Sequence, residues 1–164
     1  MQVLPIFGYD PDEENLRIIR SMFDDNTRST FDLSYDPIQS ECGPLLRELI
    51  IRNKFLDAIK FRESDLEDDL LMCISDGLKL NSTLRTLILT CNFIGDDGVI
   101  GLADSLVDNN TLEVLDLSCN KIGDIGAIAL SNSIRMNSSL VSLHLDHNKI
   151  GDDGIISLSE ALKE

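Results

Sequence analysis

Hydrophobic positions recur along most of this chain with a period of 28 residues. Three consecutive units, which begin at Leu84, Leu112 and Leu140, follow the pattern LxxLxLxxNxIGDxG. Within each unit, leucines two positions apart predict a short strand with one buried face. Apolar residues at spacings of three and four then predict a helix that buries one stripe. Neither element can bury its apolar face alone, so the repeat predicts stacked units with a parallel sheet inside and helices outside.

Two fainter copies of the unit precede the clear ones at the same step. One keeps the register at Leu56 and Phe61, and the other at Phe31 and Leu33. We expect one domain over residues 1–164, with an N-terminal capping half-repeat at 1–27 and repeats at 28–55, 56–83, 84–111, 112–139 and 140–164. The early copies depart from the pattern, so we expect distorted turns there, at Asp36 and Ser64 in place of asparagine and at Leu70 in place of glycine.

The phrase NxIGDxG marks the turn from each strand to its helix. We expect its asparagine to satisfy backbone groups that the bend leaves unpaired. The aspartate just before each helix is a good N-cap. The glycine in the first helical turn would let the helix approach the sheet. These three columns are, in that order, Asn92, Asn120 and Asn148; Ser40, Asp68, Asp96, Asp124 and Asp152; and Gly98, Gly126 and Gly154.

These residues and spacings resemble the leucine-rich repeats of the ribonuclease-inhibitor type. Similar 28-residue motifs occur in ribonuclease inhibitor, NOD-like receptors, the Ran GTPase-activating protein and the actin-capping end of tropomodulin. The resemblance is most specific over residues 84–162. It implies an α/β leucine-rich-repeat solenoid, a right-handed curved horseshoe with parallel strands on its concave face and helices on its convex face. It also implies that the chain binds proteins on the concave face.

Charge and composition narrow the class of partner. The formal net charge is −15, from 29 Asp and Glu against 14 Lys and Arg. Nucleic acids and anionic membranes would repel such a chain, so we expect a partner protein with a basic surface. No apolar run approaches the ~20 residues that span a bilayer, and the N-terminus lacks the basic region of a secretory signal. The four cysteines have no paired spacing, which favours reduced thiols and a cytoplasmic location.

The recurring glycines and acids do not indicate a catalytic or ligand site. A phosphate loop brings backbone amides and a lysine to an anion, whereas the phrase GDDG places two carboxylates there. A calcium loop needs alternating oxygen ligands and a distal glutamate, which no segment supplies. Cys119 with His147 has neither an oxyanion hole nor an orienting third group. We therefore predict no enzyme activity, no cofactor and no bound metal.

Outward-facing strand positions form columns whose neighbours lie ~4.8 Å apart on adjacent strands. Five polar side chains are expected to gather at the C-terminal end of this face, and they could ligate zinc only if they converged on one point. They are Asp116, Cys119, His144, Asp146 and His147. Lys60, Arg62 and Arg85 are expected to form a basic spot, either within an ion-pair lattice or as an anchor for an acidic partner segment. The candidate partner-binding residues are Asp32, Tyr35, Lys60, Arg62, Arg85, Ile88, Asp116, His144, Asp146 and His147.

The sequence favours a non-enzymatic protein-interaction module. One alternative is a regulator of a GTPase similar to the Ran GTPase-activating protein, although none of that family's catalytic residues can be placed here. The other is an actin-capping module similar to that of tropomodulin, although the chain lacks that family's terminal helix extension.

The two ends of the array differ. At the front, Asp10 and Pro11 resemble a helix start, and the helix that follows can cover the first strand. At the back, nothing after the final helix covers the strand over residues 140–147. We expect either that the natural chain continues past Glu164 or that this repeat associates with a second copy.

Overall fold

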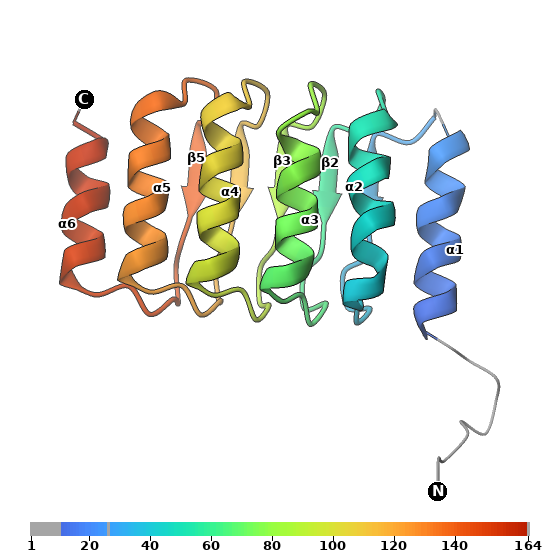
Figure 1. The fold of residues 1–164 in the computed structure, drawn as a ribbon, viewed down its shortest axis with the longest axis horizontal. Coiled ribbons are helices and arrows are strands. Elements are labelled where there is room, and N and C mark those ends of the chain that lie inside the picture. Colours follow the sequence, from blue (N-terminus) through green and yellow to red (C-terminus); the bar gives the residue numbers. More distant parts are fainter. Residues whose placement is uncertain (1–10, 26, 164) are drawn as a thin grey trace, which may run out of the picture.

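A computed structural model describes residues 11–25 and 27–163, so Asp10 and Glu164 lie outside the described residues. Strands and helices alternate along the chain as the repeat predicts (Figure 1). The helices are α1 (Pro11–Asp24), α2 (Gly43–Arg52), α3 (Asp68–Leu78), α4 (Asp96–Asp108), α5 (Asp124–Met136) and α6 (Asp152–Ala161), with a short 3-10 helix η1 (Ser40–Cys42) before α2. The strands are β1 (Thr30–Asp32), β2 (Ala58–Lys60), β3 (Thr86–Ile88), β4 (Val114–Asp116) and β5 (Ser142–His144).

The five strands form one parallel sheet in the order β1-β2-β3-β4-β5. Each strand residue pairs with the residue 28 positions later, as Leu87 does with Leu115. The helices lie side by side in a single layer on one side of this sheet (Figure 1). The parallel stack of strand and helix units is therefore confirmed.

The hydrophobic core lies between the sheet and the helix layer. The central residues of the first four strands, Phe31, Ile59, Leu87 and Leu115, are at most 2% exposed. Each helix turns an apolar stripe toward them, because residues three and four apart share one face. At the N-terminal end, α1 buries Ile19 and packs against α2 and η1. No helix in the described part of the chain is both long enough and apolar enough to cross a membrane.

The turn asparagines satisfy backbone groups as expected, and they do so across two repeats. Asn120 accepts the N–H of Ile94 at 3.2 Å through Oδ1. Its amide nitrogen donates to the carbonyl of Leu89, in the preceding repeat, at 2.9 Å and to that of Leu117 at 3.0 Å. Asn92 and Asn148 make the corresponding bonds. These side-chain amides connect each turn to the one before it.

The turn at Ser64 is altered, as expected for an early copy. The Ser64 hydroxyl donates to the carbonyl of Leu33 at 2.8 Å, over the same separation of 31 residues that the asparagines span. The serine side chain has no carbonyl oxygen that could replace the asparagine Oδ1 as an acceptor. The backbone carbonyl of Ser64 instead accepts the N–H of Ile38 at 2.9 Å, and Asp65 adopts a φ of 53°. The left-handed residue compensates for the shorter side chain.

A second column of asparagines, buried except for the partly buried Asn137, lies between each helix and the next strand. Asn109 is 1% exposed, and its amide nitrogen donates to the carbonyl of Leu78 in the preceding repeat at 2.9 Å. Its Oδ1 accepts the N–H groups of Thr111 and Leu112 at 3.1 and 2.9 Å. The equivalent residues, Asn53, Asn81 and Asn137, bond in the same way. This structural role explains why N-x-S/T sequences recur at one repeat position.

The aspartates at the helix starts do not cap their own helices, which corrects our expectation. Each aspartate is the first residue of its helix, and the N-cap residue before it is Glu67 in α3 and a glycine, such as Gly95 or Gly123, in the later helices. Asp96 Oδ1 accepts the N–H groups of Gly123 and Gly126, at the start of the next helix, at 2.7 and 2.9 Å. Because the helices lie side by side, each carboxylate reaches the free amides of its neighbour. Asp124 repeats the arrangement, and Asp68 makes the first of the two bonds.

The glycines of the first helical turn make room for this carboxylate rather than for the sheet. A Cβ atom at Gly126 would lie 2.7 Å from Asp96 Oδ1 and 2.9 Å from Ile122 Cγ2. In the early copy both positions are changed. Ser40 replaces the aspartate, and Leu70 replaces the glycine that would face it. The two departures from the pattern are therefore coupled.

The pair Asp96 and Gly126 predicts a coupled loss of stability. We expect Asp96→Ala to lower the free energy of unfolding by about 1 kcal/mol, because two amides at the start of α5 lose their acceptor. Gly126→Ala should also destabilise, because the added Cβ meets the carboxylate. Urea unfolding of both single variants and the double variant measures the coupling. In the double variant the total loss should be smaller than the sum. Purely additive losses would contradict the shared contact.

The last repeat is less buried than the repeats before it. Leu143, Leu145 and Ile150 are partly exposed, whereas their equivalents one repeat earlier are fully buried. Within residues 140–163, Gly154 and Ala161 are the only buried residues. The expected exposure of this end is confirmed. Continuation past Glu164 and self-association through this repeat both stay predictions.

Candidate functional site

The strand face is the side of the sheet that faces away from the helices. The sheet register aligns one outward residue from each strand along it, which confirms the predicted column. Its members are Asp32, Lys60, Ile88, Asp116 and His144.

A hollow of about 300 Å³ opens at the N-terminal part of the strand face. Five of the candidate partner-binding residues line this strand-face hollow, which is formed by the first three strands and the turns after β1 and β2. The lining residues are Asp32, Ser34, Tyr35, Lys60, Arg62, Thr86 and Ile88. An aromatic ring, an arginine and an aliphatic side chain around one depression are the combination that anchors protein interfaces.

The carboxylate in this hollow is held in its charged form. Burial raises the pKa of Asp32, but hydrogen bonds from the Ser34 hydroxyl and backbone N–H and the nearby charge of Lys60 outweigh it, so the pKa lies below its ordinary value. The Ser34 N–H lies 3.0 Å from Asp32 Oδ1. The Ser34 hydroxyl in turn accepts the backbone N–H of Arg62 at 3.1 Å. The polar lining is therefore oriented before any partner arrives.

The residue that ends each strand-face turn has a left-handed backbone. These residues, Tyr35, Glu63, Cys91, Cys119 and His147, have φ between 52 and 70°. That region is unfavourable for side chains other than glycine and asparagine, so the neighbouring structure must hold it. The Tyr35 N–H, for example, donates to the Arg62 carbonyl in the next repeat at 2.7 Å. The Tyr35 side chain is 64% exposed at the rim of the hollow.

The polar groups at the C-terminal end of the strand face do not converge. Asp116 Oδ1 accepts the Ser118 N–H at 2.9 Å, whereas His144 Nε2 shares a hydrogen bond with the Ser142 hydroxyl at 2.9 Å. Asp146 and His147 border a separate hollow of about 390 Å³. Within residues 11–25 and 27–163, no three His, Cys, Asp or Glu side chains are placed to hold a metal ion.

The Cys91 thiol on this face is not activated. Burial raises the pKa of the Cys91 thiol, and a hydrogen bond with the neighbouring Cys119 thiol raises it further. A thiol with a raised pKa is largely protonated at neutral pH, and the thiolate is the nucleophile. The geometry therefore offers no support for a reactive cysteine at this position.

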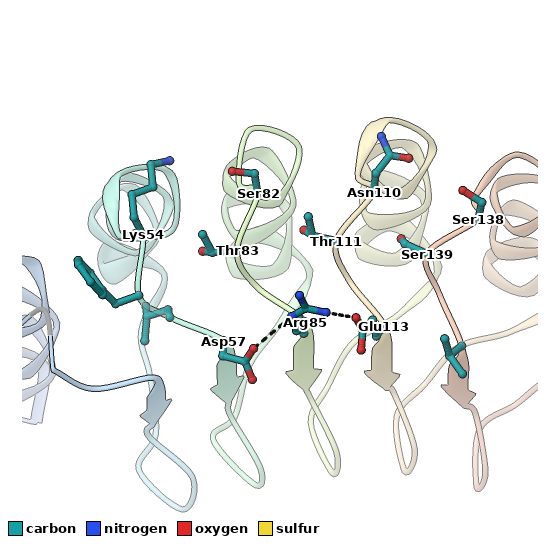
Figure 2. Close-up of a pocket in the computed structure, with 13 residues that line it drawn as sticks. Lys54, Asp57, Ser82, Thr83, Arg85, Asn110, Thr111, Glu113, Ser138 and Ser139 are labelled. Carbon is teal, nitrogen blue, oxygen red and sulfur yellow. Dashed lines mark hydrogen bonds and ion pairs between the residues drawn. The ribbon is translucent and has the colours of Figure 1, made fainter.

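Arg85 does not belong to the basic spot expected with Lys60 and Arg62. It precedes β3, at the opposite end of the strands, and lies between the carboxylates of Asp57 and Glu113 (Figure 2). Asp57 directly precedes β2 and Lys60 is its last residue, so three residues of extended chain separate the two ends of the strand by about 10 Å. The sequence contains no marker of where each strand begins, so the two ends were not distinguished. The ion-pair lattice is the correct interpretation for Arg85.

Arg85 lines a second depression, the loop-edge groove, which follows the loops that lead into β2–β5 (Figure 2). The groove has a volume of about 650 Å³ and is rich in hydroxyl groups. Its lining residues are Lys54, Phe55, Leu56, Asp57, Ser82, Thr83, Arg85, Asn110, Thr111, Glu113, Ser138, Ser139 and Val141. Apart from Arg85, none was a candidate site residue, although the recurring N-x-S/T sequences mark several of its hydroxyls.

Comparison with known proteins identifies the type of repeat. A family model described as leucine-rich repeat matches residues 80–103, 108–131 and 137–159. These three segments of the chain are leucine-rich repeats. The comparison with curated protein sequences found no match.

Two solved structures have the same fold as this leucine-rich-repeat chain. One is leiomodin-1 actin-binding site 2, with a TM-score of 0.72 and 18% identity, in an alignment that covers 98% of this chain and 90% of the other. The second is the C-terminal domain of tropomodulin from Caenorhabditis elegans, with a TM-score of 0.69, 16% identity and coverages of 94% and 92%. At these identities the likeness shows the fold, an α/β arrangement of five parallel strands alternating with helices.

Each leucine-rich repeat of this chain separates structural positions from free ones. The leucines fill the core, and the asparagines, together with the aspartates of α3, α4 and α5, bond to adjacent repeats. The outward strand residues and the residues after them are not fixed by this pattern, and they differ from repeat to repeat. Variation at free positions on a rigid scaffold is where binding specificity is expected.

Proposed function

We propose that this leucine-rich-repeat chain is a non-enzymatic protein-interaction module that binds a partner protein on its strand face. The strand-face hollow is the observation that carries the proposal. It presents the exposed ring of Tyr35 beside the cation of Arg62 and the apolar side chain of Ile88. Aromatic residues and arginine supply most of the binding energy in protein interfaces.

The charge of the chain favours a partner with a largely basic surface. The net charge of −15 would steer such a partner toward the array and repel an acidic one. Lys60 and Arg62 give the hollow a local positive edge, which suits an acidic or carbonyl group within the partner segment. Affinity should therefore fall as salt rises from low to physiological ionic strength, where the Debye length is about 8 Å.

A matched pair of double variants tests the strand-face proposal. Tyr35→Ala with Arg62→Ala removes an aromatic ring and a cation from the hollow. Lys54→Ala with Phe55→Ala removes the same two chemistries from the loop-edge groove. The wild-type chain and both variants are used to capture proteins from native lysate, with quantification by mass spectrometry. Partners should be lost with the first variant and retained with the second. Equal capture by all three chains would contradict the proposal.

Actin is the second candidate partner. One specific observation favours it, because leiomodin-1 actin-binding site 2 covers 98% of this chain with the same fold. Sedimentation with filamentous actin, together with an assembly assay on monomeric actin, tests the candidate. If the chain neither sediments with filaments nor changes assembly, actin is removed as a partner. The general proposal would then still depend on the capture experiment.

A further inference from the structure

An exposed apolar stripe crosses the outer surface of the helix layer, on the opposite side of the molecule from the strand face. One residue from each of the last five helices contributes to it, at a constant spacing of 28 positions. The members are Pro44, Met72, Ile100, Ile128 and Ile156. Met72 and Ile156 are 50% and 54% exposed, and Ile100 and Ile128 are each 37% exposed. None of these side chains is needed to fill the core.

Along the stripe, α3 and α4 approach to contact distance. Met72 Cγ lies 3.7 Å from the position that a Cβ of Gly101, on the next helix, would occupy. The residues that follow the stripe members in sequence are uncharged, partly exposed and mostly small. They are Leu45, Cys73, Gly101, Ala129 and Ser157.

Acidic residues flank the stripe on both sides. On α4, Asp97 lies one turn before Ile100 and Asp104 lies one turn after it, and all three share one helix face. The row nearer the helix starts is Glu41, Asp69, Asp97 and Asp153, with Ile125 on α5. No ion pair of these four acids occurs among the residues that the structure describes.

The row nearer the helix ends is more nearly neutral. Asp76 lies 3.6 Å from the Arg47 guanidinium, and Glu160 lies 3.8 Å from that of Arg135. The negative charge beside the stripe is therefore greater on the side of the helix starts.

We propose that this helix-face stripe is a second interaction surface and that it binds a basic amphipathic helix of a partner protein. The stripe would take the apolar side of such a helix, and the acidic rows would pair with lysine or arginine on its flanks. Seven residues of a helix advance about 10.5 Å. Adjacent packed helices lie about 8–10 Å apart. An apolar residue in every seventh position of the partner therefore meets each successive helix of the array.

A designed peptide tests the proposal directly. The probe is a fluorescein-labelled helix of about 28 residues, which matches four steps of about 10.5 Å, with leucine at every seventh position, lysine on both flanks and alanine elsewhere. A scrambled peptide of the same composition is the control. Binding to the wild-type chain is followed by fluorescence anisotropy at low and physiological salt. The wild-type chain should bind the helix and not the scrambled peptide.

Variants then assign the binding to the stripe. Ile100→Ser with Ile128→Ser should weaken binding about tenfold or more, since apolar anchors dominate interfaces. Val107→Ser changes another exposed apolar residue of α4 that is not in the stripe, so it should leave the affinity unchanged. Asp69→Asn with Asp97→Asn should reduce the salt dependence.

The strand-face proposal and this one can fail separately. Tyr35→Ala with Arg62→Ala should leave peptide binding unchanged, because those residues lie on the other side of the sheet. The inference would be overturned if the wild-type chain did not bind the helix, or if it bound the scrambled peptide equally well. Equal affinity of the wild-type chain and the isoleucine double variant would overturn it as well.

Discussion

Truncation of Leu115 to alanine should lower the free energy of unfolding by about 2–5 kcal/mol. Leu115 is the central residue of β4, it is fully buried, and repeats pack on both sides of it. The change removes apolar atoms from the core and leaves a cavity that the flanking strands cannot close without moving the whole stack. Urea denaturation monitored by far-UV circular dichroism measures the loss.

Leu143 gives the matched control. It occupies the same position one repeat later and pairs with Leu115 across the sheet. Because Leu143 is partly exposed, its truncation removes less buried surface and should cost clearly less. Equal losses at the two positions would contradict the assignment of the last repeat as an exposed end.

Asn120→Ala should lower the free energy of unfolding by about 2–4 kcal/mol, because the Ile94 N–H is left buried without an acceptor and the bonds from the amide nitrogen to backbone carbonyls are lost. The asparagine is 7% exposed, so water does not replace it easily. Thermal and urea unfolding of the variant measure the effect. A loss within about 0.5 kcal/mol of zero, typical of surface substitutions, would show that the asparagine column does not stabilise the array.

Asn120→Ser separates the two functions of the asparagine. The chain itself uses serine at the equivalent Ser64, where the hydroxyl still donates to the carbonyl of the preceding repeat. We therefore expect Asn120→Ser to be less destabilising than Asn120→Ala. It should remain below wild type, because the hydroxyl cannot reproduce the acceptor for the Ile94 N–H without the left-handed backbone seen at Asp65. Identical values for the two variants would contradict this division.

The fold could be predicted from the sequence because the 28-residue period directly identifies the core positions. Alternating leucines define short strands, and the 28-residue step fixes the pairing of Leu87 with Leu115. Once the step is known, the order of the strands and the outward column through Ile88 follow without further information. A repeat array converts one local pattern into a global arrangement.

The contacts between repeats were harder to predict. Asp96 was assigned to its own helix, because a sequence pattern supplies neighbours along the chain and not beside it. In the structure its acceptor oxygen serves Gly123 and Gly126, 27 and 30 residues later. The glycine column was the available signal, since glycine is absent where Ser40 replaces the aspartate.

The candidate site was predicted only in part. The column through Lys60 and Ile88 was correct, because it depends on alternation alone. The left-handed backbone at Tyr35 was missed, because four different residue types occupy that position in the five repeats and none is glycine. The place of Arg85 depended on where a three-residue strand begins, and strand ends are set by contacts with adjacent repeats.

Footprinting of a complex with hydroxyl radicals tests most directly whether the strand face binds the partner. The chain is labelled alone and with a partner protein whose capture depends on Tyr35 and Arg62. Labelling of Tyr35 and Ile88 should fall in the complex, because both line the strand-face hollow. Labelling of Phe55 and Val141, which are 51% and 84% exposed in the loop-edge groove, should not change. Protection of Phe55 and Val141 with unchanged labelling of Tyr35 and Ile88 would contradict the account.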